Sequence, residues 1–270
     1  MRLPPFFIPC FFFFALSLSA VAEESRESHP RTVVGPAIHS AIEGHRNLVY
    51  ATYGDREMEL DLYRPKGVAK NLPAIVCIHG GAWWKGERRH HENLAKALAA
   101  RGFVTVTISY RLSGERPFPA QIEDCKAAVR WLRANADQYG IDANLIGATG
   151  LSAGGHLTNL LATSGGVSEL EGEGGNESFS STIQAAAPMG AQSDLESERI
   201  RLRSLDPKAA FYPQFLGGSQ EEAPETYQLA SPRHHLDVSD PPILYLTGEL
   251  DDPSTHAIET RHDLLALGIS

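Results

Sequence analysis

The 270-residue sequence is poor in cysteine and short of positive charge. Three cysteines cannot build the dense disulfide framework of a small secreted scaffold. The 24 basic residues are outnumbered by 33 acidic ones, and the formal net charge of −9 argues against nucleic acid or an anionic membrane as a partner. Neither zinc-ligand spacing nor the regular ligand spacing of a calcium loop is present, so we expect no metal and no cofactor.

Long apolar runs are also rare, and the most marked one lies at the N-terminus. Arg2 is the only charge ahead of the apolar residues 6–18, and Ala20-Val21-Ala22 forms a small-x-small cleavage signature. The run is shorter than the roughly 20 residues that a bilayer span needs, and Pro9 interrupts it. We therefore expect residues 1–22 to be a signal peptide. The mature protein is expected to be secreted or periplasmic and free of the membrane.

The rest of the chain has the length of one α/β domain. Residues 23–46, with Ser, His, Pro and scattered charges, are predicted to be a flexible leader without a core of its own. From residue 47 to 270, β-type runs alternate with helical patterns, which predicts a mainly parallel sheet with helices on both faces. The predicted strands are 48–53, 57–63, 74–78, 103–109, 145–149, 183–187 and 243–247, and the predicted helices are 91–101, 121–139 and 153–163.

The two remaining cysteines and two long connecting segments complete the predicted domain. Cys77 lies in a predicted buried strand and Cys125 in a predicted amphipathic helix, so two core thiols are favoured over a disulfide. The glycine-rich residues 165–181 are predicted to form a surface loop. Residues 192–236 join two central strands and contain several aromatic side chains. They are predicted either to form a cap over the pocket or simply to pack among themselves.

The motif G-L-S-A-G at residues 150–154 follows a β-type run and precedes a helical pattern. This arrangement is typical of the nucleophile elbow of α/β-hydrolases, where a serine lies on a sharp turn between a strand and a helix. Small neighbours are needed there because larger side chains would collide with the adjoining elements. The pattern nominates Ser152 as the nucleophile, although G-x-S-x-G also occurs by chance in glycine-rich turns.

A second motif, H-G-G-A-W-W at residues 79–84, directly follows an apolar strand pattern. Acyl transfer builds negative charge on a carbonyl oxygen, and backbone amides must approach that oxygen closely. We assign the oxyanion donors to the amides of Gly81, Ala82 and Ala153. His79 is expected to be structural, since the triad order in this fold is serine, then acid, then histidine. The neighbouring Trp83 and Trp84 can stack on a sugar or an aromatic acyl group, or can pack the loop.

These motifs, together with E-L-D-L-Y-R at 59–64, S-Y-R-L at 109–112 and P-F-P-A at 117–120, resemble the secreted bacterial esterase branch of the α/β-hydrolases. That branch includes feruloyl-esterase-like (BD-FAE-like) and acetylxylan-esterase-like enzymes and is related to the hormone-sensitive-lipase type carboxylesterases. The resemblance extends from about residue 48 to the C-terminus.

This resemblance implies an α/β-hydrolase fold and a serine esterase with a Ser-His-Asp triad. The expected substrates are carboxylic esters, in particular acyl groups on plant or algal polysaccharide. An arylformamidase-like or small-acyl carboxylesterase activity is the enzymatic alternative. A non-catalytic binding protein on a hydrolase scaffold is the alternative of another class.

The resemblance also places the triad acid. The predicted strand ending at residue 247 is followed by G-E-L-D-D-P at 248–253, similar to the family's G-x-x-D loop. Asp251 has the matching spacing. Asp252 remains open as a helix-capping residue or as the acid itself, and Asp194 is a more distant alternative.

The triad histidine is harder to place. The family has it a few tens of residues after the acid, whereas the sequence ends at Ser270. His256 and His262 lie in a helical pattern at 255–267, too close to the acid loop along the chain. We therefore expect a C-terminally truncated sequence that lacks a final strand and helix together with the catalytic histidine. A natural inactive homologue is the alternative.

Overall fold

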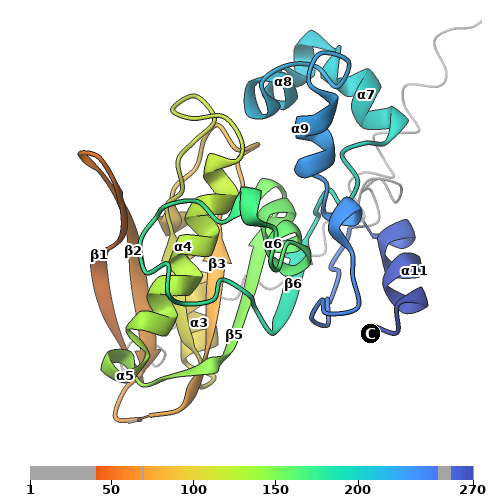
Figure 1. The fold of residues 1–270 in the computed structure, drawn as a ribbon. Coiled ribbons are helices and arrows are strands. Elements are labelled where there is room, and N and C mark those ends of the chain that lie inside the picture. Colours follow the sequence, from red (N-terminus) through yellow and green to blue (C-terminus); the bar gives the residue numbers. More distant parts are fainter. Residues whose placement is uncertain (1–40, 69, 249–256, 270) are drawn as a thin grey trace, which may run out of the picture. The chain divides into compact units, whose positions relative to one another are not determined.

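A computed structural model describes residues 41–68, 70–248 and 257–269. Its main element is a six-stranded sheet with the strand order β1-β2-β4-β3-β5-β6 (Figure 1). The strands are β1 (Ile42–Tyr53), β2 (Arg56–Pro65), β3 (Leu72–Ile78), β4 (Val104–Ile108), β5 (Ile141–Leu151) and β6 (Ala185–Met189). Strands β4, β3, β5 and β6 are mutually parallel, whereas β2 is antiparallel to both of its neighbours. The predicted α/β class is confirmed.

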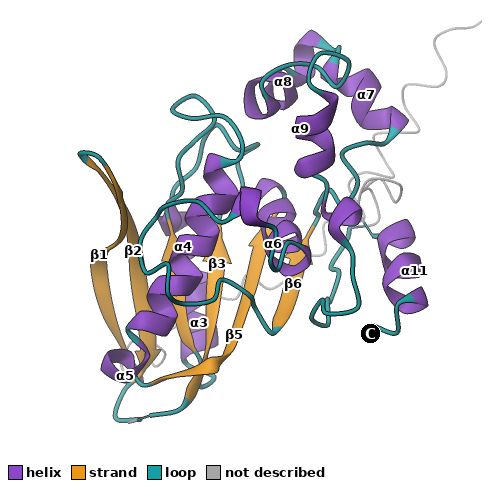
Figure 2. Cartoon of the chain, viewed as in Figure 1, coloured by secondary structure: helices purple, strands orange, loops and turns teal. Residues whose placement is uncertain are grey.

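The helices lie on both faces of the sheet (Figure 2). The helices α4 (Ala120–Ala134) and α6 (Ala153–Thr163) contact each other and β3 and β5. The helix α3 (Glu92–Ala99) contacts β2 and β4. Because side chains alternate along a strand, Val76 and Ile78 belong to the large core cluster, while Cys77 between them packs with Ala95 and Ala99 of α3.

The remaining helices are short. They are α5 (Ala136–Tyr139), α7 (Glu198–Ser204), α8 (Phe211–Leu216), α9 (Pro224–Leu229) and α11 (Ile258–Ala266). The described residues also form the 3-10 turns η1 (Arg88–His91), η2 (Ser168–Leu170), η3 (Pro207–Ala209) and η4 (Pro232–His235). The predicted helix 121–139 is divided at Asn135 into α4 and α5. Within the described residues, none of the helices has the length and apolarity required to cross a membrane.

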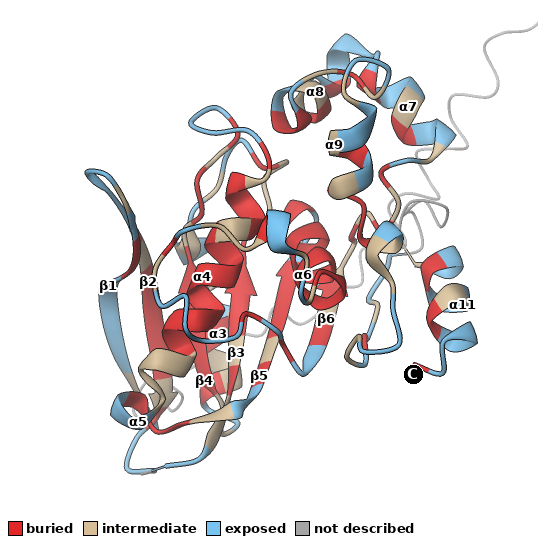
Figure 3. Cartoon of the chain, in the orientation of Figure 1, coloured by how far each residue is buried: buried red, intermediate tan, exposed pale blue. Residues whose placement is uncertain are grey.

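The first strand starts earlier than predicted. The predicted leader, residues 23–46, overlaps β1, since Ile42 pairs with Pro65 and Gly44 with Tyr63. Ile42 is buried, but the residues that follow it are largely exposed, and Figure 3 shows β1 as the most exposed strand. An edge strand with so few buried side chains has almost no hydrophobic periodicity to detect. The predicted signal peptide, residues 1–22, and residues 23–40 lie outside the described residues.

The last predicted strand, residues 243–247, is less regular than expected. It lies beside β6 in the parallel direction, but it is joined only by isolated bridges between Ala186 and Ile243 and between Met189 and Leu246. On the α3 side, a groove of about 530 Å³ runs over β3, β5 and β6 from Leu94 and Leu98 to Leu244. Cys77 and Cys125 are buried and free, and burial raises the pKa of the Cys77 thiol to about 12.

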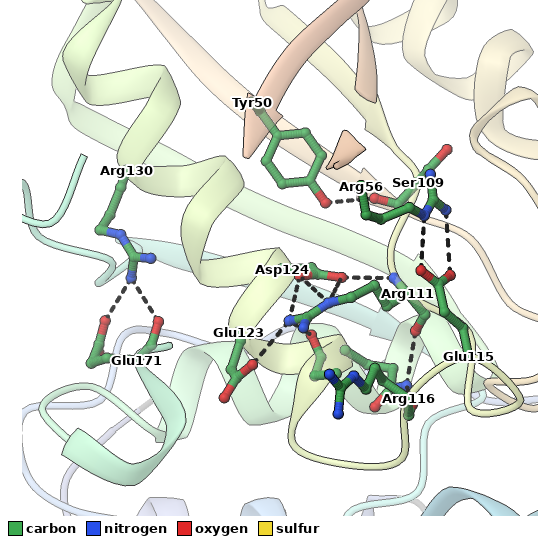
Figure 4. A network of polar contacts seen from close by, with 12 residues as sticks. Tyr50, Arg56, Ser109, Arg111, Glu115, Arg116, Glu123, Asp124, Arg130 and Glu171 are labelled. Carbon is green, nitrogen blue, oxygen red and sulfur yellow. Dashed lines mark hydrogen bonds and ion pairs between the residues drawn. The ribbon is translucent and has the colours of Figure 1, made fainter. Parts of the chain in front are cut away.

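The S-Y-R-L motif directly follows β4, and its Arg111 belongs to the network of polar contacts drawn in Figure 4. The Arg111 guanidinium binds the buried Asp124 carboxylate, with an Nη2–Oδ1 distance of 2.8 Å, and binds Glu123 at 2.9 Å. The Arg111 backbone amide also donates to Asp124 Oδ2 at 2.6 Å. Its guanidinium carbon lies 3.6 Å from the centroid of the Tyr53 ring. Arg111 therefore has a structural role, because it joins α4 to the edge strand β1.

The carboxylate of Glu171 anchors the predicted surface loop to α4. Glu171 accepts from Lys126 Nζ at 2.7 Å and from Arg130 Nη1 at 3.0 Å. The Lys126 and Arg130 side chains are 1% and 2% exposed. Two buried cations thus share this carboxylate as an ion-pair partner, and its removal would take a counter-charge from both of them in a poorly hydrated place.

Candidate active site

Ser152 forms the turn between β5 and α6 and is exposed. Its φ of +56° and ψ of −118° lie in a region that non-glycine residues rarely adopt. The Ser152 amide donates to Met189 O at 2.8 Å, and its carbonyl accepts from the His156 amide at 2.8 Å. A strained serine held at the carboxyl end of a central parallel strand has the geometry expected of a nucleophile elbow.

The turn needs glycine because backbone atoms of β3 lie against it. A Cβ added to Gly154 would lie 2.1 Å from Ile78 O, and one on Gly150 would lie 2.3 Å from Gly154 O. Neither contact can be relieved by a side-chain rotation, since the opposing atoms belong to the backbone. The sequence requirement for small residues around Ser152 is thus a packing requirement between β3, β5 and α6.

Gly154→Ala is expected to lower the free energy of unfolding by about 3 kcal/mol or more, because the backbone must move to admit the methyl group. Gly165→Ala is a matched control, since its Cβ would lie 3.4 Å from Thr182 Cγ2, an ordinary contact. The control is expected to stay within about 1 kcal/mol of the unmodified protein. Urea unfolding followed by circular dichroism measures both, and equal values would contradict the close approach.

The loop of residues 79–86, between β3 and η1, lies directly beside the elbow. It is called the oxyanion loop below, after the donors predicted in it. A Cβ on Gly80 would be 2.6 Å from Leu151 O and 3.5 Å from the Cβ of Ser152. Gly81 has a φ of +125° and its carbonyl accepts from the amides of Trp84 and Lys85, which closes a tight turn. Ala153 is the first residue of α6, so its amide has no acceptor within the helix. The segments that carry the three predicted oxyanion amides, those of Gly81, Ala82 and Ala153, therefore meet at Ser152.

His79 has the contacts of a structural residue. It is 1% exposed, its ring stacks on Tyr110 with centroids 4.2 Å apart, and Nδ1 lies 2.8 Å from Gly80 O. The Tyr110 hydroxyl donates to the His79 carbonyl at 3.0 Å. Burial lowers the pKa of His79 to about 4 and keeps its ring neutral. These contacts agree with the predicted structural role.

The two tryptophans of the loop differ in exposure. Trp83 is 1% exposed and Trp84 is 47% exposed. The Trp83 ring stacks on Phe215, with centroids 4.3 Å apart and planes at 2°. Neighbouring side chains thus enclose the Trp83 ring, which favours packing of the loop, one of the two roles predicted for it, over stacking on a substrate. Trp84 remains a candidate for stacking, with Lys85 Nζ 5.3 Å from its ring centroid.

The side chains that enclose Trp83 come from the predicted cap insertion, residues 192–236, which contains α7, α8 and α9. The ring centroids of Phe211 and Tyr212 lie 6.3 and 5.8 Å from that of Trp83. The Phe215 carbonyl accepts from the Phe118 amide at 2.8 Å. The aromatic residues of the insertion thus pack onto the oxyanion loop as well as among themselves.

Sequence reasoning missed His156, which lies in the middle of these contacts. It is fully buried, accepts from Trp83 Nε1 through Nδ1 at 3.2 Å, and its Nε2 lies 2.8 Å from Ala230 O. Burial lowers its pKa to about 4. The available signal was a lone histidine in an otherwise apolar helical pattern directly after the elbow.

Protein stability is expected to fall as the pH drops from about 6.5 to about 4. Burial lowers the pKa of both His79 and His156 from 6.5 to about 4 in the folded protein. Between these pH values the unfolded chain binds protons that the folded protein does not. The contribution of the two neutral histidines to the free energy of unfolding is therefore complete above pH 6.5 and is lost on acidification. Each histidine contributes up to about 3 kcal/mol.

Urea unfolding at several pH values tests this expectation. His156→Asn should show a smaller pH-dependent loss than the unmodified protein, since carboxylates respond alike in both and the difference isolates one histidine. Parallel stability curves for the two proteins would exclude a proton-linked role for His156.

A pocket of about 580 Å³ contains the candidate nucleophile. Its walls come from the elbow, the end of β6 and the segment after residue 245, with Ser152, Met189, Gln192 and Thr247 among the lining residues. Asp251, Asp252 and His256 lie outside the described residues. The predicted acid loop follows Gly248, which itself lines this pocket.

The other acid and base candidates have different partners. Asp194 accepts from Arg233 Nη1 at 3.1 Å, in an ion pair within the insertion. The His262 side chain is 84% exposed on α11 and lies 3.5 Å from Asp263. In the described part of the chain, we find no hydrogen bond between a histidine side chain and the Ser152 hydroxyl. The same residues hold no cluster of three or more histidine, cysteine or carboxylate side chains that could bind a metal ion.

Several known proteins are similar to this chain. Esterase LipQ of Mycobacterium tuberculosis is 33% identical over 212 residues, which cover 77% of this chain and 49% of LipQ. The chain thus spans about half the length of this relative. Among solved structures, a bifunctional GH43-CE protein of Bacteroides eggerthii has a TM-score of 0.71 and 30% identity, over 83% of this chain and 33% of that one. A truncated form of a carbohydrate esterase from gut microbiota has a TM-score of 0.69 and 29% identity, over 84% and 85%.

These similarities confirm the predicted α/β-hydrolase fold. The BD-FAE family model matches residues 60–259, a range that includes the oxyanion loop, the elbow and the predicted acid loop. The chain therefore belongs to the BD-FAE family.

Proposed function

We propose that this protein hydrolyses carboxylic esters with Ser152 as the nucleophile, and that its substrates are acyl groups attached to carbohydrate. The observation that carries the proposal is the contact between the strained Ser152 turn and the loop of Gly80 and Gly81, at the wall of a pocket. In this arrangement the segments that carry the nucleophile and the candidate oxyanion amides lie against each other, as acyl transfer requires.

In the proposed reaction, Ser152 Oγ attacks the ester carbonyl while a histidine takes its proton. The negative charge that develops on the carbonyl oxygen is stabilised by the amides of Gly81, Ala82 and Ala153. Collapse of the intermediate expels the alcohol, which receives the proton, and water then releases the acid from the acyl-serine. We assign the orienting carboxylate to Asp251, and both it and the histidine lie outside the described residues.

The carbohydrate part of the proposal is supported by two observations. One similar solved structure is that of a carbohydrate esterase from gut microbiota, and another is that of a bifunctional GH43-CE protein. In this chain, the indole of Trp84 is exposed next to the oxyanion loop, where it can stack on a sugar ring. Secretion after removal of residues 1–22 would bring such an enzyme to a polymeric substrate.

A substrate panel tests the proposal. Protein that carries its triad histidine is expected to release acetate from acetylated xylan and to hydrolyse p-nitrophenyl acetate, with Ser152→Ala as the blank. Release of ferulate from methyl ferulate would identify an aromatic acyl preference. Hydrolysis of an aryl formamide alone would favour the arylformamidase-like alternative, and the absence of any Ser152-dependent hydrolysis would favour a non-catalytic binding protein.

A further inference from the structure

The oxyanion loop contains a strained backbone at its centre. Ala82 and Trp83 have φ values of +50° and +61°, although neither is a glycine. Left-handed conformations of such residues are unfavourable and persist only where the surroundings hold them. The amide of Ala82 is one of the proposed oxyanion donors, so whatever holds this pair of residues also sets the position of a donor.

Trp83 has the contacts that can hold the loop. Its carbonyl accepts from the Ser113 amide at 2.8 Å, its ring stacks on Phe215, and its indole donates to His156 Nδ1 at 3.2 Å. The indole and imidazole rings meet edge to face, with centroids 5.3 Å apart. Among these contacts, the bond to His156 connects the loop to the helix that begins next to Ser152.

The hydrogen bonds of His156 determine the tautomer of its ring. An indole N–H can only donate, so Nδ1 of His156 must offer a lone pair. The proton of the neutral ring is then on Nε2, which donates to Ala230 O at 2.8 Å. Burial lowers the pKa of His156 to about 4, in agreement with a neutral ring. Both ring nitrogens are therefore used in defined directions, one toward the oxyanion loop and the other toward the insertion.

We propose that His156 is a positioning residue for the oxyanion hole, which sets the Gly81 and Ala82 amides relative to Ser152 through its hydrogen bond to Trp83. His156 lies one helical turn after Ser152, and its own amide donates to the Ser152 carbonyl at 2.8 Å. The same helical turn thus carries the nucleophile at one end and the anchor of the oxyanion loop at the other. The inference rests on the proposed function of Ser152.

Two substitutions at His156 separate this role from general structural support. In His156→Asn, the side-chain oxygen takes the approximate place of Nδ1 and can still accept from Trp83. In His156→Gln, the longer amide reaches the place of Nε2 and can still donate to Ala230 O, but the acceptor for Trp83 is lost. Trp83→Phe removes the same hydrogen bond from the other side and keeps an aromatic ring against Phe215.

We expect His156→Gln and Trp83→Phe to lower kcat for p-nitrophenyl acetate by about 10-fold to 100-fold with KM within about twofold, because displacement of a catalytic group by about 1 Å costs about that much. The decrease in kcat should be clearly smaller in His156→Asn. The double variant His156→Gln with Trp83→Phe should be no worse than the poorer single variant, since both remove one bond. All variants are compared at equal folded fraction by circular dichroism.

The Trp83 indole N–H provides a readout that does not depend on turnover. In nuclear magnetic resonance spectra it should be protected from hydrogen exchange in the unmodified protein and in His156→Asn, and should lose protection in His156→Gln. Equal kcat losses in the Asn and Gln variants, or a loss confined to KM, would overturn the positioning role. If hydrolysis were insensitive to Ser152→Ala, the proposed function would fail first, and the exchange data would show separately whether the contact exists.

Discussion

Replacing Ser152 with alanine is expected to abolish covalent labelling by a fluorophosphonate probe and to reduce ester hydrolysis to a small residual rate. The probe reports on the nucleophile directly, since it reacts with an activated serine and forms a stable bond to its oxygen. In a hydrolase whose triad is in place, loss of the serine lowers kcat by a factor on the order of 10⁶. What remains is the contribution of the oxyanion hole and of substrate binding.

Ser168→Ala is the matched control for this experiment. Ser168 is an exposed serine in η2, and its hydroxyl donates to the neighbouring Glu169. Its loss should change neither labelling nor turnover. Mass spectrometry of the labelled protein locates the modified residue, and a label that persists in Ser152→Ala would assign the nucleophile to another serine.

Asp251→Asn is expected to lower turnover by about 10⁴-fold in protein that carries its histidine, because an amide favours the wrong tautomer and cannot stabilise the charged ring. Asp252→Asn should leave most of the activity if Asp252 only caps a helix. Steady-state hydrolysis of p-nitrophenyl acetate measures both variants, with the fold checked by circular dichroism.

The ranking of the two variants decides the assignment of the acid. A larger loss in Asp252→Asn would transfer the role to that residue. Equal insensitivity of both would direct attention to Asp194, although its ion pair with Arg233 makes that role less favourable.

The fold and the two chemical motifs could be predicted from the sequence because their signals are local. Helix α6 has the predicted bounds Ala153–Thr163, since the glycine motif fixes its start and an apolar pattern fills it. The loop after β3 and the turn after β5 meet because these adjacent parallel strands end at the same edge of the sheet. Their contact beside Ser152 follows from that topology.

Side-chain partners far apart in the sequence could not be predicted in the same way. The burial of Trp83 depends on Phe215 and His156, and nothing in the spacing of these residues indicates that they meet. The start of β1 was missed for a different reason. Its pairing with β2 is made by backbone hydrogen bonds, which do not depend on the identity of the side chains. Site geometry therefore followed from motifs, whereas exposure of individual site residues required the structure.

The anchoring of the glycine-rich loop by Glu171 has a consequence for engineering. From its composition, residues 165–181 suggest a segment that could be exchanged or lengthened at will. Glu171 holds two buried cations, however, and Gly174 has no room for a side chain, since its Cβ would lie 2.5 Å from the Ala127 Cβ. A tag or binding peptide grafted into this loop would therefore be tolerated best at Glu177 and Ser178, which are exposed and lie beyond both anchor points.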